Sequence, residues 1–168
     1  MDKIKKIFVP TDFSSASQEA IAYAAFLAER FNAAILLAHI LEPFGYPVDL
    51  AIIDAPELER MRARRQLGRL ARLLRREGIE IETALLMGDP APLIVERAVK
   101  GGADLIVMGT HGRSGAAHLL MGSVAEKVVR SSPLPVLTVR RKKEEQREEK
   151  EAKGRAAAAS GGGSQADG

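Results

Sequence analysis

The chain has 168 residues, of which 46% are hydrophobic and 28% are charged, a composition typical of a globular domain. It contains no cysteine, which excludes disulfides, thiolate nucleophiles and cysteine-ligated zinc or iron–sulfur clusters. Its 25 basic and 22 acidic residues leave a net charge of only +3, which gives little support for a nucleic-acid-binding protein.

The N-terminal residues 1–6 lead into a strand-like segment with no apolar leader before it. No apolar run approaches the roughly 18 residues that a membrane-spanning helix needs. We therefore expect a cytoplasmic protein with no membrane partner.

Short aliphatic segments alternate with longer segments of helical period along the first 140 residues. Strands are predicted over residues 4–10, 33–41, 79–87, 104–109 and 135–140, and helices over residues 14–31, 56–77, 90–100 and 122–130. The runs at 35–37 and 105–108 are continuously apolar, which favours strands that are covered on both faces. The pattern predicts an α/β fold, a doubly wound, five-stranded, mainly parallel sheet with helices on both faces.

Capping signals accompany three of the predicted helix starts. Ser15 precedes Gln18 by three residues, Asp89 precedes Pro90, and Ser123 precedes Glu126 by three residues. We expect Ser15, Asp89 and Ser123 to cap their helices.

The predicted helix over residues 56–77 is rich in arginine. Its apolar residues at helical spacing are expected to form the buried stripe: Leu58, Met61, Leu67, Leu70, Leu73 and Leu74. We interpret the arginines as a solvated face. The alternative is a surface for RNA, DNA or an acidic partner, which the scarcity of aromatic residues disfavours.

The last 28 residues differ in composition from the rest of the chain. Residues 141–153 carry mostly mixed charges, and residues 154–168 are rich in glycine, alanine and serine. Such a segment has too few apolar side chains to offset the loss of chain entropy on folding. We expect one domain over residues 1–140 and a disordered or loosely helical tail over 141–168.

Two loops carry the residues that indicate a binding site. The glycine-rich segment 109–115 and the pair Gly122-Ser123 precede the last helix, where a backbone can approach phosphates and unpaired N–H groups can bind them. Arg113 could pair with the same anion. The alternative is a flexible loop with an ordinary capping serine.

The second loop, residues 9–14, follows the first strand, which neighbours the fourth strand in a doubly wound sheet. Asp12 is its only carboxylate and could bind an adenine amino group or ribose hydroxyls. The alternative is that Asp12 only organises the turn or the start of the next helix.

Four motifs in the order of one family extend over about residues 3–140. They are Val9-Pro10-Thr11-Asp12-Phe13-Ser14, Leu36-Leu37-Ala38-His39-Ile40, Gly88-Asp89-Pro90, and Gly109-x-x-Gly112 followed after nine residues by Gly122-Ser123. The ending, residues 132–139, follows the same pattern. The chain resembles the universal stress protein family, in the subgroup that keeps the nucleotide-binding glycines.

The resemblance implies a usually dimeric protein that binds ATP, with Mg²⁺ as a possible companion of the nucleotide. It places Pro10, Thr11 and Asp12 at the adenine and ribose, Ile40 at the base, Met108 and Gly109 at the ribose, and Gly112, Arg113, Gly122, Ser123 and Val124 around the phosphates. No metal-binding side chain and no catalytic residue is expected.

The last strand is an edge of the predicted sheet, made apolar by Val136, Leu137 and Val139, so we expect a homodimer that pairs through it, as the family's usual dimer mode also implies. The alternative is a monomer whose edge is shielded by the charged tail.

Other nucleotide-binding motifs are absent. The chain has neither the P-loop pattern nor the glycines of a Rossmann fingerprint after its first strand. His39 is expected to be a buried, hydrogen-bonded imidazole, and His111 and His118 are expected to be loop or packing residues.

The preferred function is a stress-adaptation protein that binds ATP and regulates or binds a partner, with at most slow hydrolysis. One alternative is a nucleotide-independent interaction module that uses the arginine-rich helix or the tail to bind an unknown protein. Another is a slow ATPase that signals by hydrolysis or autophosphorylation at Ser114 or Ser123.

Overall fold

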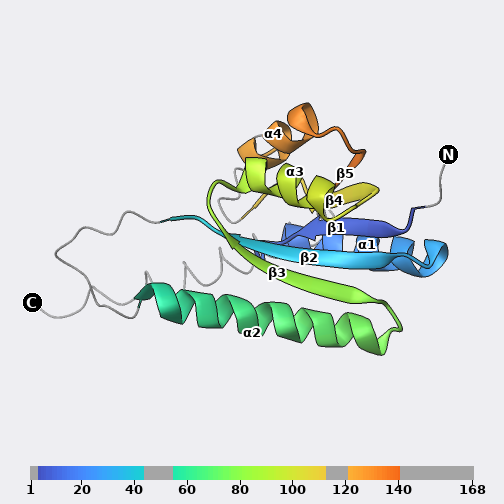
Figure 1. Ribbon diagram of the computed structural model, residues 1–168, viewed down its shortest axis with the longest axis horizontal. Coiled ribbons are helices and arrows are strands. Elements are labelled where there is room, and N and C mark those ends of the chain that lie inside the picture. The colour runs from blue at the N-terminus through green and yellow to red at the C-terminus, as the bar shows by residue number, and fades with distance from the viewer. Residues whose placement is uncertain (1–3, 44–54, 113–120, 141–168) are drawn as a thin grey trace, which may run out of the picture.

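The computed structural model describes residues 4–43, 55–112 and 121–140, which form a parallel sheet between two helical layers (Figure 1). The strands are β1 (Lys6–Pro10), β2 (Ala34–Leu41), β3 (Ile81–Met87), β4 (Leu105–Gly109) and β5 (Val136–Val139). The helices are α1 (Ser15–Phe31), α2 (Ala55–Arg76), α3 (Pro90–Lys100) and α4 (Ser123–Ser131). The predicted fold class is confirmed, and each bound lies within two residues of the predicted one.

The strand order is β3-β2-β1-β4-β5, and every neighbouring pair is parallel. The chain therefore builds one half of the sheet outward from β1, returns to the other side of β1 at β4, and ends at the edge with β5. Since the order reverses between β1 and β4, the loops that leave these two strands diverge and open a crevice between them.

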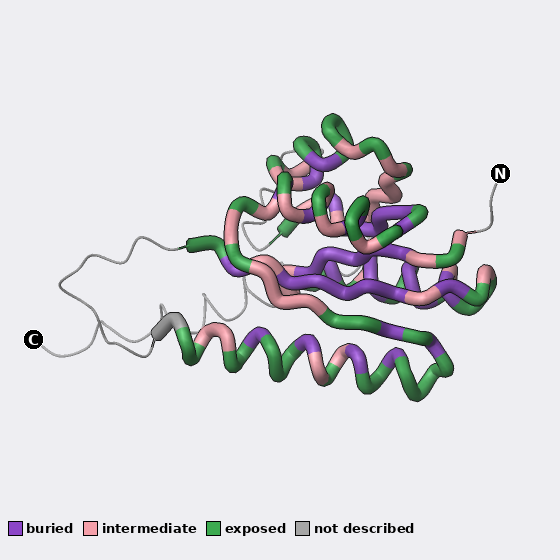
Figure 2. The backbone as a smooth tube through the Cα atoms, viewed as in Figure 1, coloured by how far each residue is buried: buried purple, intermediate pink, exposed green. Residues whose placement is uncertain are grey.

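Alternation along each strand divides the core into two parts, one on each face of the sheet. Ile7 and Val9 of β1 pack in the cluster formed with α1 and α2, whereas Phe8 packs in the cluster formed with α3 and α4. Most residues of the central strands β1, β2 and β4 are buried, as Figure 2 shows in purple. This two-sided burial explains why the predicted strand segments are continuously apolar.

Small residues dominate the face of α1 that contacts the sheet. Ala20, Ala24 and Ala28, spaced one turn apart, are at most 2% exposed. Near the start of the helix, a Cβ built on Gly109 of β4 would come within 2.9 Å of the Ala16 carbonyl oxygen. The backbone of α1 therefore lies close to the strands.

The buried stripe of α2 is only partly the predicted one. Leu67 and Leu74 are buried and Leu70 is half-buried, but the remaining buried positions of this face are alanines, Ala63 and Ala71. The predicted core residues Leu58, Met61 and Leu73 are exposed by 42%, 49% and 46%. The prediction was wrong for these three because the buried stripe runs through Ala63, Leu67, Ala71 and Leu74. That stripe turns Leu58, Met61 and Leu73 outward.

The first helix begins at a different cap from the predicted one. Ser14 rather than Ser15 is the N-cap, and its Oγ accepts a hydrogen bond from the Ser17 N–H at 3.3 Å. The Asp12 carboxylate accepts hydrogen bonds from the Ser14 N–H at 3.0 Å and from its Oγ at 2.6 Å. These bonds fix Ser14 in the extended conformation that an N-cap requires, so the helix starts one residue after it.

The start of α4 also differs from the prediction, because Gly122 and not Ser123 is the N-cap. The Gly122 N–H donates to the Thr110 carbonyl oxygen at 2.7 Å, which holds this residue outside the helix. Glu126 pairs with Arg130 at 3.0 Å instead of reaching back to the cap. At α3, Asp89 is the N-cap as predicted, but its side chain makes no capping hydrogen bond.

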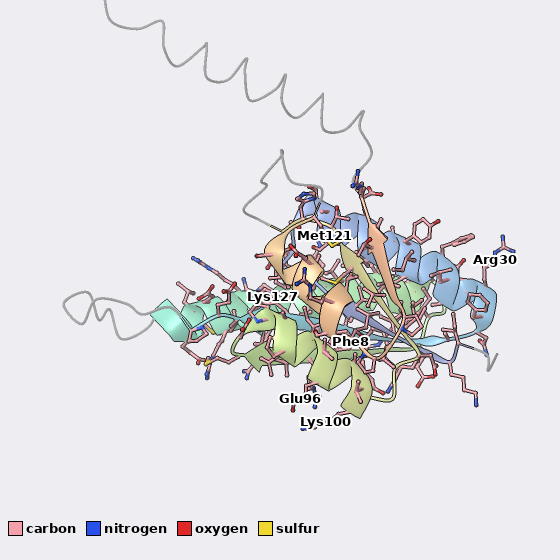
Figure 3. The ribbon with its side chains drawn as sticks, turned by 90° about the horizontal axis from the view of Figure 1, so that it is seen from above. Phe8, Arg30, Glu96, Lys100, Met121 and Lys127 are labelled. Carbon is pink, nitrogen blue, oxygen red and sulfur yellow. The ribbon has the colours of Figure 1, made fainter. Side chains whose placement is uncertain are left out.

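Exposed ion pairs lie on the outer surface of the layer formed by α3 and α4. Glu96 and Lys100 lie side by side on α3, where Figure 3 labels both, and the hydrogen bond from Lys100 lowers the pKa of the Glu96 carboxyl. Exposed pairs of this kind on a helix surface contribute little to stability.

Within the three described ranges, no helix has the length and the apolarity needed to cross a membrane. The predicted tail, residues 141–168, lies outside the described residues, and so do Arg113, Ser114 and His118.

Candidate functional site

A cleft of about 160 Å³ lies at the carboxyl ends of β1 and β4, where the strand order reverses. It is lined by most of the residues that the sequence singled out. Those that line it are Pro10, Thr11, Asp12, Ile40, Met108, Gly109, Gly112, Gly122, Ser123 and Val124. Arg113 lies outside the described residues.

The loop that follows β1 forms one wall of the cleft and is held by its own hydrogen bonds. Thr11 is 4% exposed, its N–H donates to the Ala38 carbonyl oxygen at 2.8 Å, and its Oγ1 lies 3.0 Å from the Ser17 hydroxyl. The two bonds from Ser14 to the Asp12 carboxylate belong to the same loop. Asp12 thus has the turn-forming role that we weighed as an alternative, and it also lines the cleft.

Glycines form the opposite wall at places where a side chain would fill space. A Cβ built on Gly112 would lie 2.8 Å from Asp12 Oδ2, and one built on Gly122 would lie 3.3 Å from the Thr110 carbonyl oxygen. The loop after β4 therefore passes close to the loop after β1, with room for a ligand and little for a side chain.

The N-terminus of α4 supplies hydrogen-bond donors to this wall. The first N–H groups of a helix have no acceptor within the helix, and Gly122 has no side chain that could serve as one. Ser123, Val124 and Ala125, which begin the helix, all line the cleft. These N–H groups and the partial positive charge of the helix end suit a phosphate.

Several lining residues were not among the predicted ones. They are Ser17, Glu42, Pro90, Ile94, Thr110, His111 and Ala125. Pro90 and Ile94 come from the first turns of α3. The position of α3 at the cleft depends on its packing with α4, which the spacing of residues along the sequence does not predict. Pro90 did carry a signal, since it belongs to the Gly88-Asp89-Pro90 motif.

The lining of the cleft combines apolar and polar groups. The apolar side chains of Ile40, Ile94 and Met108 line it together with the glycines and the start of α4. The ionisable side chains of the described lining are Asp12, Glu42 and His111, and His111 Nδ1 lies 3.0 Å from the Thr110 hydroxyl. Among the described residues, no three His, Cys, Asp or Glu side chains converge as metal ligands.

His39 has the predicted role of a buried, hydrogen-bonded imidazole. It is 5% exposed, and its Nδ1 lies 2.6 Å from the carbonyl oxygen of Thr11. A carbonyl oxygen can only accept, so Nδ1 carries the proton in this bond. His39 therefore supports the cleft wall from behind without lining the cleft.

Comparisons with known proteins point to one family. A sequence model of the universal stress protein family matches residues 3–140. Universal stress protein MJ0531 of Methanocaldococcus jannaschii is 39% identical over 140 residues, which cover 82% of each chain.

Solved structures share the same architecture. The structure of hypothetical protein MJ0577, also from Methanocaldococcus jannaschii, is 28% identical with a TM-score of 0.78 and covers 84% of this chain and 99% of its own. A universal stress protein from Archaeoglobus fulgidus in complex with dAMP is 27% identical with a TM-score of 0.57, covering 82% and 99% of the two chains.

Proposed function

Since the chain belongs to the universal stress protein family, we propose that its cleft binds ATP and that the protein acts in stress adaptation by nucleotide-dependent binding or regulation. The observation that carries the proposal is the convergence of ten predicted residues from three separate parts of the chain on one cleft. The dAMP complex of a family member supports an adenine nucleotide as the ligand class.

In this proposal the nucleotide lies across the strand ends. The loop of Thr11 and Asp12 and the backbone of Ile40 hold the adenine and ribose, while Met108 and Gly109 border the ribose. The phosphates lie against Gly112, Gly122 and the first N–H groups of α4, and Arg113 adds a charge there. Mg²⁺, when present, is held by phosphate oxygens.

We propose that the main activity of the protein is to bind ATP and that ATP hydrolysis is slow or absent. Hydrolysis of the terminal phosphate requires an oriented water and stabilisation of charge in the transition state. The proposed phosphate contacts are glycines, the Ser123 hydroxyl and helix N–H groups, which bind anions without activating water. His111 also lines the cleft, where its Nδ1 lies 3.0 Å from the Thr110 hydroxyl, and we assign it no catalytic role.

Isothermal titration calorimetry with ATP, ADP, AMP, adenosine and GTP tests the proposal directly. We expect adenine nucleotides to bind and GTP to bind more weakly. Gly122→Val should weaken ATP binding at least about tenfold, or about 1.4 kcal/mol, because its side chain enters the phosphate wall. Gly68→Val is the matched control, since Gly68 lies in α2, away from the cleft.

A folded protein that binds no nucleotide, or a Gly122→Val variant with unchanged affinity, would contradict the proposal. The first result would favour the nucleotide-independent interaction module. Measurement of ADP release from ATP over hours separates a binding protein from a slow ATPase, and labelling with radioactive ATP tests transfer to serine.

We further propose a homodimer that pairs through β5. This strand pairs with β4 on one side and is the edge of the described sheet, and Val136, Leu137 and Val139 are half-buried. Pro135 and Val139 direct their carbonyl groups to β4, so alternation turns the N–H groups of Val136 and Thr138 outward. A second copy can pair with this edge around a twofold axis.

Light scattering on Thr138→Pro tests this interface. The proline removes an outward N–H and leaves the ladder to β4 in place, so we expect a folded monomer. Thr138→Val keeps the N–H and should remain dimeric. A monomeric wild-type protein at micromolar concentration, or a dimeric proline variant, would rule the interface out.

A further inference from the structure

A second cleft, of about 310 Å³, lies on the other face of the sheet, between the turn after β1 and helix α2. His39 lines this cleft while the next residue, Ile40, lines the first one. Successive residues of a strand point to opposite faces, so the two clefts lie on opposite sides of the end of β2.

The polar part of this second cleft is positively charged. Arg62 and Arg65 of α2 line it together with Gln66 and one carboxylate, Glu59. The ion pairs among the described residues are Lys6–Glu82, Lys100–Glu96 and Arg130–Glu126, so neither arginine is neutralised by a carboxylate of that part of the chain. Two guanidinium groups against one carboxylate favour an anionic ligand.

The floor of the second cleft is aromatic. The rings of Phe13 and His39 are packed with their centroids 4.4 Å apart and their planes tilted by 40°. Phe13 is half-buried and His39 is buried, and both line the cleft. Such a surface favours a flat ring, and the rim arginines lie beside it on α2.

The geometry of this floor is fixed before any ligand arrives. Phe13 has a φ of 64°, an unusual conformation for an aromatic residue. Its N–H donates to Thr11 Oγ1 at 3.0 Å, and the Thr11 carbonyl accepts from His39. A surface held by its own hydrogen bonds needs little ordering when a ligand binds.

We propose that the second cleft binds a small aromatic phosphate ester, with its phosphate between Arg62 and Arg65 and its ring against Phe13 and His39. The side chains of Gln66 and Glu59 complete the rim, where they can bond hydroxyl or amino groups of the ligand. This assigns a ligand-binding role to part of the arginine-rich helix. The assignment does not depend on nucleotide binding in the first cleft.

Calorimetry of the full chain with phenyl phosphate, first without nucleotide and then with saturating ATP, tests the proposal. Arg62→Gln and Arg65→Gln should each weaken binding at least about tenfold, the loss of one charge-assisted contact. Arg69→Gln and Arg72→Gln are matched controls, because they remove the same charge from exposed positions of the same helix outside the cleft. The controls should change the affinity less than about twofold.

The ring contact has its own test. Phenyl phosphate should bind more tightly than inorganic phosphate, and Phe13→Asn should remove this preference, since asparagine tolerates the positive φ and lacks the ring. The proposal is overturned if phenyl phosphate does not bind, if the Arg69 and Arg72 variants lose as much affinity as those of Arg62 and Arg65, or if ATP displaces the probe. Displacement by ATP would place the probe in the first cleft.

Discussion

The Asp12 carboxylate holds the turn through Oδ1, and a comparison of two substitutions of Asp12 separates this role from the proposed ligand contact. Oδ1 accepts both hydrogen bonds from Ser14, the N-cap of α1. Oδ2 lies 2.8 Å from the position of a Cβ on Gly112, across the cleft wall. Asp12→Asn keeps the Oδ1 acceptor and removes the charge, whereas Asp12→Ala removes both.

The expected magnitudes differ for stability and for binding. Asp12→Ala loses the bonds that set the cap of α1, which should cost about 1 kcal/mol of unfolding free energy, or about 3 °C in the melting temperature. Asp12→Asn should cost less than about half of that, since its amide oxygen still accepts from Ser14. Both variants should lose about 1.5–3 kcal/mol of ligand binding, roughly a 10- to 150-fold weakening, because a charged acceptor at the base and ribose is gone.

Calorimetry with ATP and with adenosine, beside thermal unfolding of each variant, measures both effects. We expect the two ligands to weaken by similar factors, since Asp12 is assigned to the part that they share. An asparagine variant with wild-type affinity would show that Asp12 only organises the turn. A variant that loses ATP binding and keeps adenosine binding would move Asp12 to the phosphate end.

Further predictions concern stability. Gly109→Ala places a Cβ 2.9 Å from the Ala16 carbonyl oxygen and should lower the free energy of unfolding in urea by about 1–3 kcal/mol. Gly68→Ala within α2 should raise it by up to about 1 kcal/mol. If Gly109→Ala were the more stable of the two variants, the close approach of α1 to β4 would be refuted. The Lys5 and Lys6 N–H groups lower the pKa of Asp104, so its stabilising effect is present above the unfolded-state value and lost as the pH falls through the folded-state value. Asp104→Asn should therefore lower the melting temperature at neutral pH, and the difference from wild type should shrink below the ordinary value of about 3.9; a difference that does not depend on pH would exclude this cause. Truncation after Lys143 should leave the melting temperature within a few degrees and nucleotide affinity unchanged, and a large loss of either would show that the tail contacts the domain.

The fold could be predicted because its main signals are local. Runs such as Leu105 to Met108 are continuously apolar, as expected for strands that are covered on both faces. A turn that contains glycine or proline follows such a run, and after it comes a segment whose apolar residues have helical spacing. Once the sheet is known to be doubly wound, the neighbourhood of β1 and β4 follows, and with it the place where the loops of Asp12 and Gly112 meet.

Some features could not be predicted because the sequence offers two or more nearly equivalent choices and only the packed structure decides between them. Ser14 and Ser15 are both plausible caps, and the choice falls to Ser14 because Asp12 bonds to it. The outward position of Leu58 and Met61 depends on how closely α2 approaches the sheet, which alanine permits. The second cleft combines residues 13, 39 and 59–66, which only the packing of α2 brings together.

The alanine face of α1 has a consequence for how the molecule tolerates change. Alanine has no side-chain rotamers to lose on burial. The packing of Ala20, Ala24 and Ala28 against the strands therefore contributes a modest hydrophobic stabilisation with almost no loss of side-chain entropy. Ala24→Gly removes one methyl group, whereas Ala24→Val adds two methyl groups and should push α1 away from the strands. Because Ser17, in the first turn of the same helix, lines the candidate cleft, we expect such a displacement to change the width of that cleft. Ala20, Ala24 and Ala28 would then influence the cleft without lining it.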